Sequence, residues 1–295
     1  MKKNTFLIWL SAARPQTLAA ALVPVLAGCA LAFNYGLFRW DTSVVALNCA
    51  FLIQIGTNFA NDYYDFIKGA DTPDRIGFTR ATSAGLITPE SMFRATLLTM
   101  LLAFLFGLYL IWIGGWVILG IGLLSILFGL LYTGGPYPLG YNGLGDLFVF
   151  LFFGIIAVTG TFYVNALEWN FISLIISLPV GALSVNILVV NNLRDIEQDR
   201  ITGKRTVGVL FGETALKLEY LLLLLLSYII PVLLSIFAES GLIILLPLLS
   251  IPMGVYLNHQ IWNHDNKRTL NRTLEHTAQF MVLYGLLFSI GIIFM

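Results

Sequence analysis

Two clusters of acidic and amide side chains each end a long apolar stretch of the chain. The first cluster covers residues 54–65, Q-I-G-T-N-F-A-N-D-Y-Y-D, and the second covers residues 191–200, N-N-L-R-D-I-E-Q-D-R. Each residue of an α-helix turns about 100°, so each cluster gathers its polar groups on one face, and Glu197 points away. The two faces carry Gln54, Asn58, Asn61, Asp62 and Asp65, and then Asn191, Asp195 and Asp199.

Carboxylates on a membrane helix need water, a basic partner or a cation. These acids lie at carboxyl ends of helices, where the helix dipole disfavours negative charge. A bound Mg²⁺, which prefers oxygen ligands, offsets that cost; the alternative is that the helix ends simply reach water. If the two faces oppose each other, they form one magnesium site. The expected ligands are Asn61, Asp65, Asn191, Asp195 and Asp199, with Asp62 and Asp71 as further candidates.

A loop with basic residues follows each acidic cluster. Lys68, Arg75 and Arg80 follow the first cluster, and Lys204 and Arg205 follow the second. Acids, a divalent metal and basic side chains together suit a diphosphate leaving group, whose departure leaves negative charge to be neutralised. The alternative is the general excess of basic residues in cytoplasmic loops. We expect diphosphate contacts from Arg80, Lys204 and Arg205, and catalytic roles for Asp65, Asp195, Asp199, Arg80 and Lys204.

A third feature is a connection rich in glycine and tyrosine, residues 132–146, Y-T-G-G-P-Y-P-L-G-Y-N-G-L-G-D, which has no basic residue. Tyrosines beside an apolar cavity could face a developing carbocation or orient an aromatic acceptor. The alternative is the aromatic belt of a membrane interface. The expected substrate contacts here are Tyr132, Tyr137 and Tyr141.

The elements that carry these residues are membrane helices. The 295 residues are 58% hydrophobic and 11% charged, whereas about 25% of a soluble domain is charged. The net charge of zero gives no field that attracts nucleic acid. A span needs about 20 apolar residues, and nine can be placed, with Gly114-Gly115 as a hairpin between the third and fourth. They cover residues 6–33, 43–66, 92–112, 116–133, 146–166, 170–192, 216–238, 241–258 and 276–295.

Basic residues predict the orientation. With nine spans, fifteen of the sixteen Lys and Arg residues fall on the side of the N-terminus, and only Arg39 falls opposite. Since cytoplasmic loops carry this excess, the N-terminus and both acidic clusters should face the cytoplasm. The expected fold is all-α, a single domain over residues 1–295 with nine transmembrane helices around a central cavity. A weak repeat relates halves 1–133 and 146–258, and residues 276–295 add a ninth helix.

The two acidic motifs, the nine-span plan and the glycine-rich connection resemble the UbiA superfamily of intramembrane aromatic prenyltransferases. Within it, four stretches are similar to the 1,4-dihydroxy-2-naphthoate prenyltransferases. One departure is that residue 69 is Gly where much of the superfamily has the last acid of N-D-x-x-D-x-x-x-D; the next acid here is Asp71. The four stretches are R-P-Q-T-L-A-A-A-L-V-P-V at 14–25, N-D-Y-Y-D-F-I-K-G-A-D at 61–71, Y-T-G-G-P-Y-P-L-G-Y at 132–141 and T-A-Q-F-M-V-L-Y-G-L-L-F-S-I-G at 277–291.

The resemblance implies Mg²⁺-dependent transfer of a polyprenyl group from its diphosphate to 1,4-dihydroxy-2-naphthoate, with loss of the carboxyl group, in menaquinone or phylloquinone synthesis. Arg14 and Lys68 join the expected substrate contacts. The protein would be integral to the bacterial inner membrane, with its isoprenoid substrate in the lipid bilayer. Two alternatives stay open: another acceptor, such as 4-hydroxybenzoate or homogentisate, and a cation-coupled secondary transporter.

Overall fold

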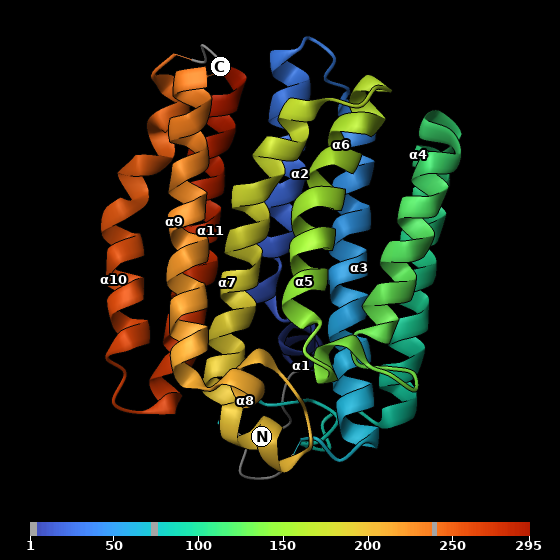
Figure 1. Cartoon of the computed structure of the whole chain (residues 1–295). Helices are drawn as coiled ribbons and strands as arrows, with labels where there is room; N and C mark the ends of the chain where they lie inside the picture. The colour runs from blue at the N-terminus through green and yellow to red at the C-terminus, as the bar shows by residue number, and fades with distance from the viewer. Residues whose placement is uncertain (1–4, 72–75, 238–240) are drawn as a thin grey trace.

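The structure, a computed structural model, describes residues 5–71, 76–237 and 241–295. Every regular element within those ranges is helical, which confirms the predicted all-α class. The helices stand side by side in one bundle (Figure 1). The α-helices are α1 Thr5–Ala13, α2 Ala19–Asn34, α3 Trp40–Ile67, α4 Pro89–Leu131, α5 Gly145–Val149, α6 Ala157–Ala166, α7 Phe171–Ile201, α8 Val207–Phe211, α9 Glu213–Phe237, α10 Ile251–Trp262 and α11 Leu270–Ile293. A π-helical segment, Phe150–Ile156, joins α5 to α6, and short 3-10 segments cover Pro15–Thr17, Leu139–Tyr141, Ile243–Ser250 and Lys267–Thr269.

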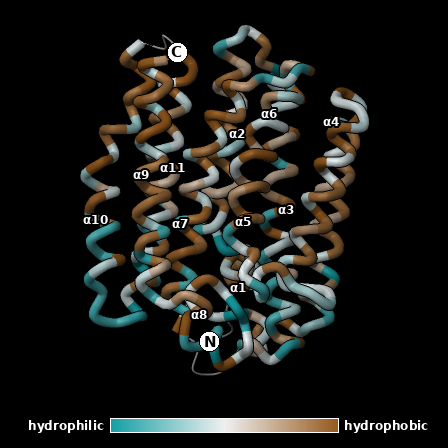
Figure 2. Tube along the Cα trace, viewed as in Figure 1, coloured by the Kyte–Doolittle hydropathy of each residue, from teal (hydrophilic) through white to brown (hydrophobic). Residues whose placement is uncertain are grey.

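Most of these helices are membrane spans. In the part of the chain that the structure describes, seven helices are long and apolar enough to cross a membrane, or eight if the bent pair Thr5–Thr17 and Ala19–Asn34 is one span. Hydrophobic residues fill the middle of the bundle, and polar residues gather at the end where α8 lies (Figure 2). The chain is therefore an integral membrane protein. The count of nine spans stays a prediction, since it requires α4 to cross twice.

The long helix α4 is folded back on itself, as the predicted hairpin at Gly114-Gly115 requires. Gly115 has φ 67° and ψ −151°, a conformation that only glycine adopts at little cost. A Cβ added to Gly129 would lie 3.6 Å from Met100 Cε, although the 29 residues between them would span about 43 Å in a straight helix. The two halves of α4 therefore lie against each other (Figure 1).

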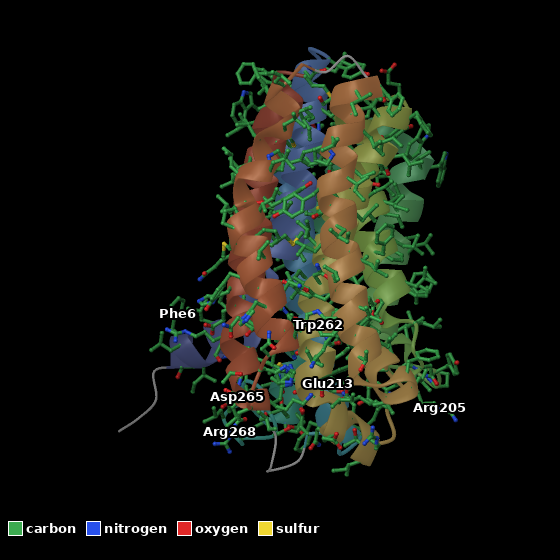
Figure 3. All side chains as sticks on the ribbon, turned by 60° about the vertical axis from the view of Figure 1, so that its left-hand side comes forward. Phe6, Arg205, Glu213, Trp262, Asp265 and Arg268 are labelled. Carbon is green, nitrogen blue, oxygen red and sulfur yellow. The ribbon has the colours of Figure 1, made fainter. Side chains whose placement is uncertain are left out.

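The first predicted span, residues 6–33, is not one continuous helix. The chain breaks at Arg14, which has φ 53° and ψ 72°, and segment Thr5–Thr17 is bent by 53° from α2. Pro15 explains the break, because a residue before proline is disfavoured in the helical region. The break leaves Phe6 of α1 projecting from the bundle (Figure 3).

Helix α7 lies at the centre of the bundle and packs against α9, α11 and the π-helical segment. Small residues allow the closest of these contacts: a Cβ added to Gly154 would lie 2.6 Å from the Cα of Gly181. Membrane helices depend on such close packing because lipid provides no hydrophobic drive for association. Helices α3 and α7 both contribute residues to the wall of one cavity.

Candidate active site

One cavity of about 370 Å³ extends into the bundle, with walls from α2, α3, α4, α6 and α7. Its polar end is lined by both acidic clusters, and the rest is lined mainly by apolar side chains of α3, α4 and α6. The two faces therefore meet, as the hypothesis of one shared site requires. The predicted residues in its lining are Arg14, Asn61, Asp65, Arg80, Tyr132, Tyr141, Asn191, Asp195, Asp199 and Lys204.

Asp65 is the centre of the polar end, and its side chain is 2% exposed. Its Oδ1 accepts a hydrogen bond from the Tyr141 hydroxyl at 2.6 Å and one from Lys204 Nζ at 3.3 Å. Arg80 Nη2 lies 3.6 Å from Oδ2. Burial and the charge of Asp65 raise the pKa of Tyr141 well above its usual range, so this hydroxyl is a neutral donor.

The second acidic cluster is held by Arg194, which is 2% exposed. Its Nε and Nη2 donate to the two carboxylate oxygens of Asp195, each at 2.7 Å. Nη2 also donates to Asn191 Oδ1 at 2.7 Å, and Nη1 donates to Asn271 Oδ1 at 3.0 Å. The sequence interpretation missed Arg194, because it counted this residue only among the basic residues that predict the orientation in the membrane. The available signal was its position directly before Asp195, inside a helix.

Lys204 joins the two clusters, because its Nζ lies 3.3 Å from Asp65 Oδ1 and 3.9 Å from Asp199 Oδ1. The side chain of Glu197 is 70% exposed and forms an ion pair with Arg200 at 3.2 Å. This confirms the prediction that Glu197 points away from the acidic face.

The amides of α3 hold neighbouring segments of the site. Asn58 Nδ2 donates to the Ala13 carbonyl and to Thr17 Oγ1, each at 2.9 Å, and Gln54 Nε2 donates to Thr17 Oγ1 at 3.0 Å. Asn61 Oδ1 accepts from Thr133 Oγ1 at 2.8 Å. The cluster therefore fixes the turn after α1 as well as the end of α4.

Asp62 is not brought to the cavity, although it was predicted as a candidate metal ligand. Its two oxygens accept hydrogen bonds from the backbone N–H groups of Ala81 and Thr82, each at 3.0 Å. The physical reason is that neighbouring helical residues lie about 100° apart, so Asp62 cannot share the narrow face of Asn61. Asp62 instead anchors the loop that carries Arg80.

Asp71 and Lys68 lie beside the cavity rather than in its lining. Asp71 Oδ1 is 3.7 Å from Arg80 Nε, and its Oδ2 accepts from Ser83 Oγ at 3.3 Å. Lys68 Nζ donates to the Thr133 carbonyl at 2.6 Å. Lys68 and Lys204 Nζ lie 4.8 and 4.6 Å from the centre of the Tyr141 ring, close enough for cation–π attraction.

Tyr137 and Arg205, two further predicted substrate contacts, point away from the cavity. Tyr137 is 61% exposed, in a turn between two prolines that faces outward. The backbone N–H of Arg205 donates to the Tyr141 carbonyl at 2.8 Å, and its side chain projects from the bundle (Figure 3). The sequences of the two loops do not show which of their residues point into the cavity, so Tyr137 could not be distinguished from Tyr141, nor Arg205 from Lys204.

The polar end offers oxygen donors suited to a divalent cation. Among the described residues, no group of three His, Cys, Asp or Glu side chains is close enough to hold a metal. The carboxylates and amides that line the cavity nevertheless have the donor chemistry that Mg²⁺ prefers. Arg80, Arg194 and Lys204 balance the acids, and a metal bound here would share the same oxygens with these cations. The oxygen donors at this end of the cavity therefore match the ligands that Mg²⁺ prefers.

Three comparisons with known proteins show what this chain is similar to. Residues 21–284 match the UbiA prenyltransferase family. A 1,4-dihydroxy-2-naphthoate octaprenyltransferase of Escherichia coli (strain K12) is 37% identical over 292 residues, which cover 96% of this chain and 94% of the relative. One from Mycobacterium tuberculosis is 40% identical over 216 residues, covering 73% of this chain and 74% of the relative.

The fold is also found in a solved structure, a UbiA homologue from Archaeoglobus fulgidus bound to GPP and Mg²⁺. The TM-score is 0.68 at 16% sequence identity, covering 96% of this chain and 99% of the homologue. At this identity the likeness concerns the fold. The match over residues 21–284 and the 37% identity to the E. coli enzyme, together with the two acidic helix faces, show that the chain belongs to the UbiA prenyltransferase family.

Proposed function

We propose that this protein transfers a polyprenyl group from polyprenyl diphosphate to 1,4-dihydroxy-2-naphthoate, with loss of the acceptor's carboxyl group as CO₂. The observation that carries the proposal is a long apolar cavity with buried acids and basic side chains at one end. Such a cavity suits a donor with a charged head and an isoprenoid tail. The E. coli and M. tuberculosis relatives, both naphthoate octaprenyltransferases, support this acceptor.

The basic side chains at the polar end would bind the diphosphate. Arg80 and Lys204 lie within 4 Å of Asp65 and are only 12% and 13% exposed, so their charges act in a poorly screened environment. As the allylic C–O bond breaks, its electron pair leaves with the diphosphate, and these cations stabilise the growing charge. The electron-rich acceptor ring then attacks the allylic carbon.

The acids and amides of the two faces would hold Mg²⁺, with Asn61, Asp65, Asn191, Asp195 and Asp199 as the donors. When bound, the ion supplies positive charge to the diphosphate oxygens. The A. fulgidus homologue bound to Mg²⁺ supports this use of a divalent ion.

Removing one acid tests the metal site. Asp65→Ala and Asp195→Ala should abolish turnover and weaken Mg²⁺ binding, measured by calorimetry on protein that stays folded in detergent. Glu197→Ala is the matched control on α7 and should remain close to wild type, because its side chain faces solvent. A Glu197→Ala variant as damaged as Asp195→Ala would contradict the assignment.

We place the site at the cytoplasmic face of the bacterial inner membrane. The excess of basic residues on one side supports this orientation, and polar residues gather at the end of the bundle where α8 lies (Figure 2).

Product mass spectrometry tests the proposed reaction. Purified protein in detergent is given Mg²⁺, prenyl diphosphates of several lengths, and 1,4-dihydroxy-2-naphthoate, 4-hydroxybenzoate or homogentisate. The expected product is a prenylated, decarboxylated naphthalenediol. Product from another acceptor alone would reassign the substrate, and absence of diphosphate release in every mixture would favour a transporter.

A further inference from the structure

Helix α1 is apolar on every side, although it projects from the bundle. Its nine residues, TFLIWLSAA, include no charged side chain. A helix that is hydrophobic all round belongs in a protein core or in a membrane. At about 1.5 Å per residue, α1 is only about 14 Å long, whereas the hydrocarbon core of a bilayer is about 30 Å thick. It is therefore too short to be a membrane span of its own.

One face of α1 points away from the protein. Leu7 and Leu10 are 58% and 44% exposed, and Phe6 is 69% exposed. These three side chains lie within about 100° of one another around the helix, and we call them the outer face of α1. Phe6 projects sideways from the bundle and lies nearer its middle than Asp265 and Arg268, which mark the polar end (Figure 3). The outer face is therefore at the boundary between the polar end and the apolar middle.

The outer face adjoins the lipid-facing surface of α4. Helix α1 packs in one cluster with Met92 and Ala95 in the first turns of α4. Leu97 and Leu98, which follow on α4, are 49% and 59% exposed, and α4 has the length and hydropathy of a membrane helix. Residues 15–34 already match the length of about 20 residues that the first crossing needs. Helix α1 is therefore placed to lie along the membrane surface, beside the lipid that covers α4.

The opposite face of α1 supports the loop that carries Arg80. Ala12 is 4% exposed and lies in one buried cluster with Ala81 and Ile87 of that loop, and Trp9 packs against the same cluster. Ala81 directly follows Arg80 in the chain. Helix α1 therefore lies between the membrane surface and the loop that places the Arg80 guanidinium in the main cavity.

We propose that the outer face of α1 binds the lipid surface, at the boundary of headgroups and acyl chains, and that this contact braces the Arg80 loop. Lys2 and Lys3 directly precede α1 in the sequence, and basic residues next to an interfacial helix favour a bilayer with anionic headgroups. The lipid contact stands without the proposed function. The effect on the donor rests on that function, because it assigns Arg80 to the diphosphate.

The depth of a spin label tests the lipid contact without catalysis. Full-length protein with Cys29 and Cys49 replaced by alanine carries a nitroxide at Leu10→Cys, in vesicles of phosphatidylethanolamine and phosphatidylglycerol. The label should collide more often with oxygen, which dissolves in lipid, than with a water-soluble nickel complex. Leu98→Cys on α4 is the lipid-facing control, and Arg268→Cys at the polar end is the control for water.

Binding of an unreactive donor analogue tests the brace. Calorimetry in the same lipids measures the Kd of geranyl S-thiolodiphosphate with Mg²⁺ present. The double variant Leu7→Ser with Leu10→Ser should raise this Kd about 3- to 10-fold, within the range of coupling through packed elements. Leu98→Ser, the matched control on the lipid-facing side of α4, should leave it unchanged.

A double-mutant cycle tests whether the effect passes through Arg80. In an Arg80→Ala background, the two serine substitutions on α1 should change the Kd no further. The same loss of affinity in both backgrounds would overturn the brace, because α1 would then act on the site by another route. An unchanged Kd in the double variant would overturn it too.

The lipid contact is overturned if the label at Leu10→Cys meets the nickel complex as often as the label at Arg268→Cys. Failure of the proposed function looks different. In that case the label lies in lipid and the loss of analogue binding depends on Arg80, but the wild type yields no prenylated naphthalenediol.

Discussion

Asp65 is the residue on which the polar contacts of the site converge. Arg80, Lys204 and Tyr141 all reach it, from three separate segments of the chain. A buried carboxylate without partners would be strongly destabilising, and paired cations remove that cost. The same cations are then already in place for an anionic leaving group. The positive charges of the site are therefore positioned before the donor binds.

Loss of either cation should slow the chemical step. Arg80→Ala and Lys204→Ala should each lower kcat and kcat/KM together by about 10²–10³, because stabilisation of charge in the transition state is lost. Arg80→Lys should recover only part of the rate, since the compact charge of an ammonium cannot replace the planar, paired N–H donors of a guanidinium. Steady-state kinetics per folded molecule measures this, with Arg268→Ala as control. Equal behaviour of all three alanine variants would leave the basic loops as topology signals only.

Asp62 should behave as an anchor of the loop and not as a metal ligand. Asp62→Ala leaves the N–H groups of Ala81 and Thr82 without their acceptor, at about 1–3 kcal/mol each. The melting temperature should fall, and the KM for prenyl diphosphate should rise because Arg80 shifts. The Mg²⁺ concentration at half-maximal rate should stay unchanged. A raised Mg²⁺ requirement would return Asp62 to the ligand set.

At the scale of elements, the sequence predicted best where helical geometry alone decides. The rotation of 100° per residue places Asp65, Asp195 and Asp199 on inner faces and Glu197 outside, and these positions are observed. The same rotation places Asp62 about 100° from Asn61. The prediction that Asp62 shares the face of Asn61 therefore included too wide an arc of the helix. Gly114-Gly115 likewise indicates the hairpin in α4, since few other features allow such a reversal.

The loops could not be predicted in the same way. Tyr141 and Tyr137 share one connection, yet Tyr141 reaches Asp65 and Tyr137 faces outward. Their orientation depends on contacts with other segments, which spacing along the chain does not contain. Arg194 was missed for a related reason, because its contacts to Asn271 and to the loop before α4 come from far away in sequence.

Arg194 connects three elements through one guanidinium. It holds Asp195 on α7 and Asn271 on α11, and Asn271 Nδ2 in turn donates to the Ile76 carbonyl at 3.0 Å. Gly77 lies so close that an added Cβ would be 2.7 Å from Arg194 Nη2. The loop that carries Arg80 is therefore positioned by the same side chain that orients the second acidic cluster.

Replacing Arg194 should damage both stability and the site. Arg194→Ala removes the guanidinium that donates to both oxygens of the buried Asp195 and should destabilise the protein by about 3–5 kcal/mol, measured by thermal unfolding in detergent. Arg194→Lys should fold better but lose much of the rate, since a single ammonium cannot hold Asp195 and Asn271 together. Arg200→Lys, in an exposed pair on the same helix, is the control. Normal kinetics of Arg194→Lys would show that the paired N–H donors of the Arg194 guanidinium are not needed to position the site.

At the scale of the whole molecule, α1 and the end of α11 lie at opposite ends of the bundle (Figure 1). An odd number of crossings is needed for this, which fits the predicted nine. The cavity follows the same axis. From Asp65 to Ala46, both in its lining, α3 alone rises about 28 Å. The acidic end and the apolar end of the cavity are therefore separated by most of the membrane's thickness.

We call the packed apolar side chains at the apolar end of the cavity its floor, and we expect them to limit the length of the donor's tail. Ala46, Cys49, Leu110, Ile118 and Val164 pack together there and line the cavity. Ala46→Phe adds bulk at this floor, far from the charged end. It should lower kcat/KM for long prenyl diphosphates by at least about tenfold, because each methylene that loses its buried place costs about 0.8 kcal/mol. Geranyl diphosphate, whose tail is much shorter than the cavity, should react at nearly the wild-type rate.

The matched control is Val44→Phe, two residues earlier on α3, where the side chain is 52% exposed on the outer surface. It adds a ring to the same helix without entering the cavity, so it should leave the ratio of long to short donors unchanged. The measurement is competition between two prenyl diphosphates in one reaction, with both products quantified by mass spectrometry. If Ala46→Phe slows both donors equally, the tail does not reach this floor and leaves the cavity earlier along its length. If only the long donor is lost, the five floor residues determine which tails this membrane protein accepts.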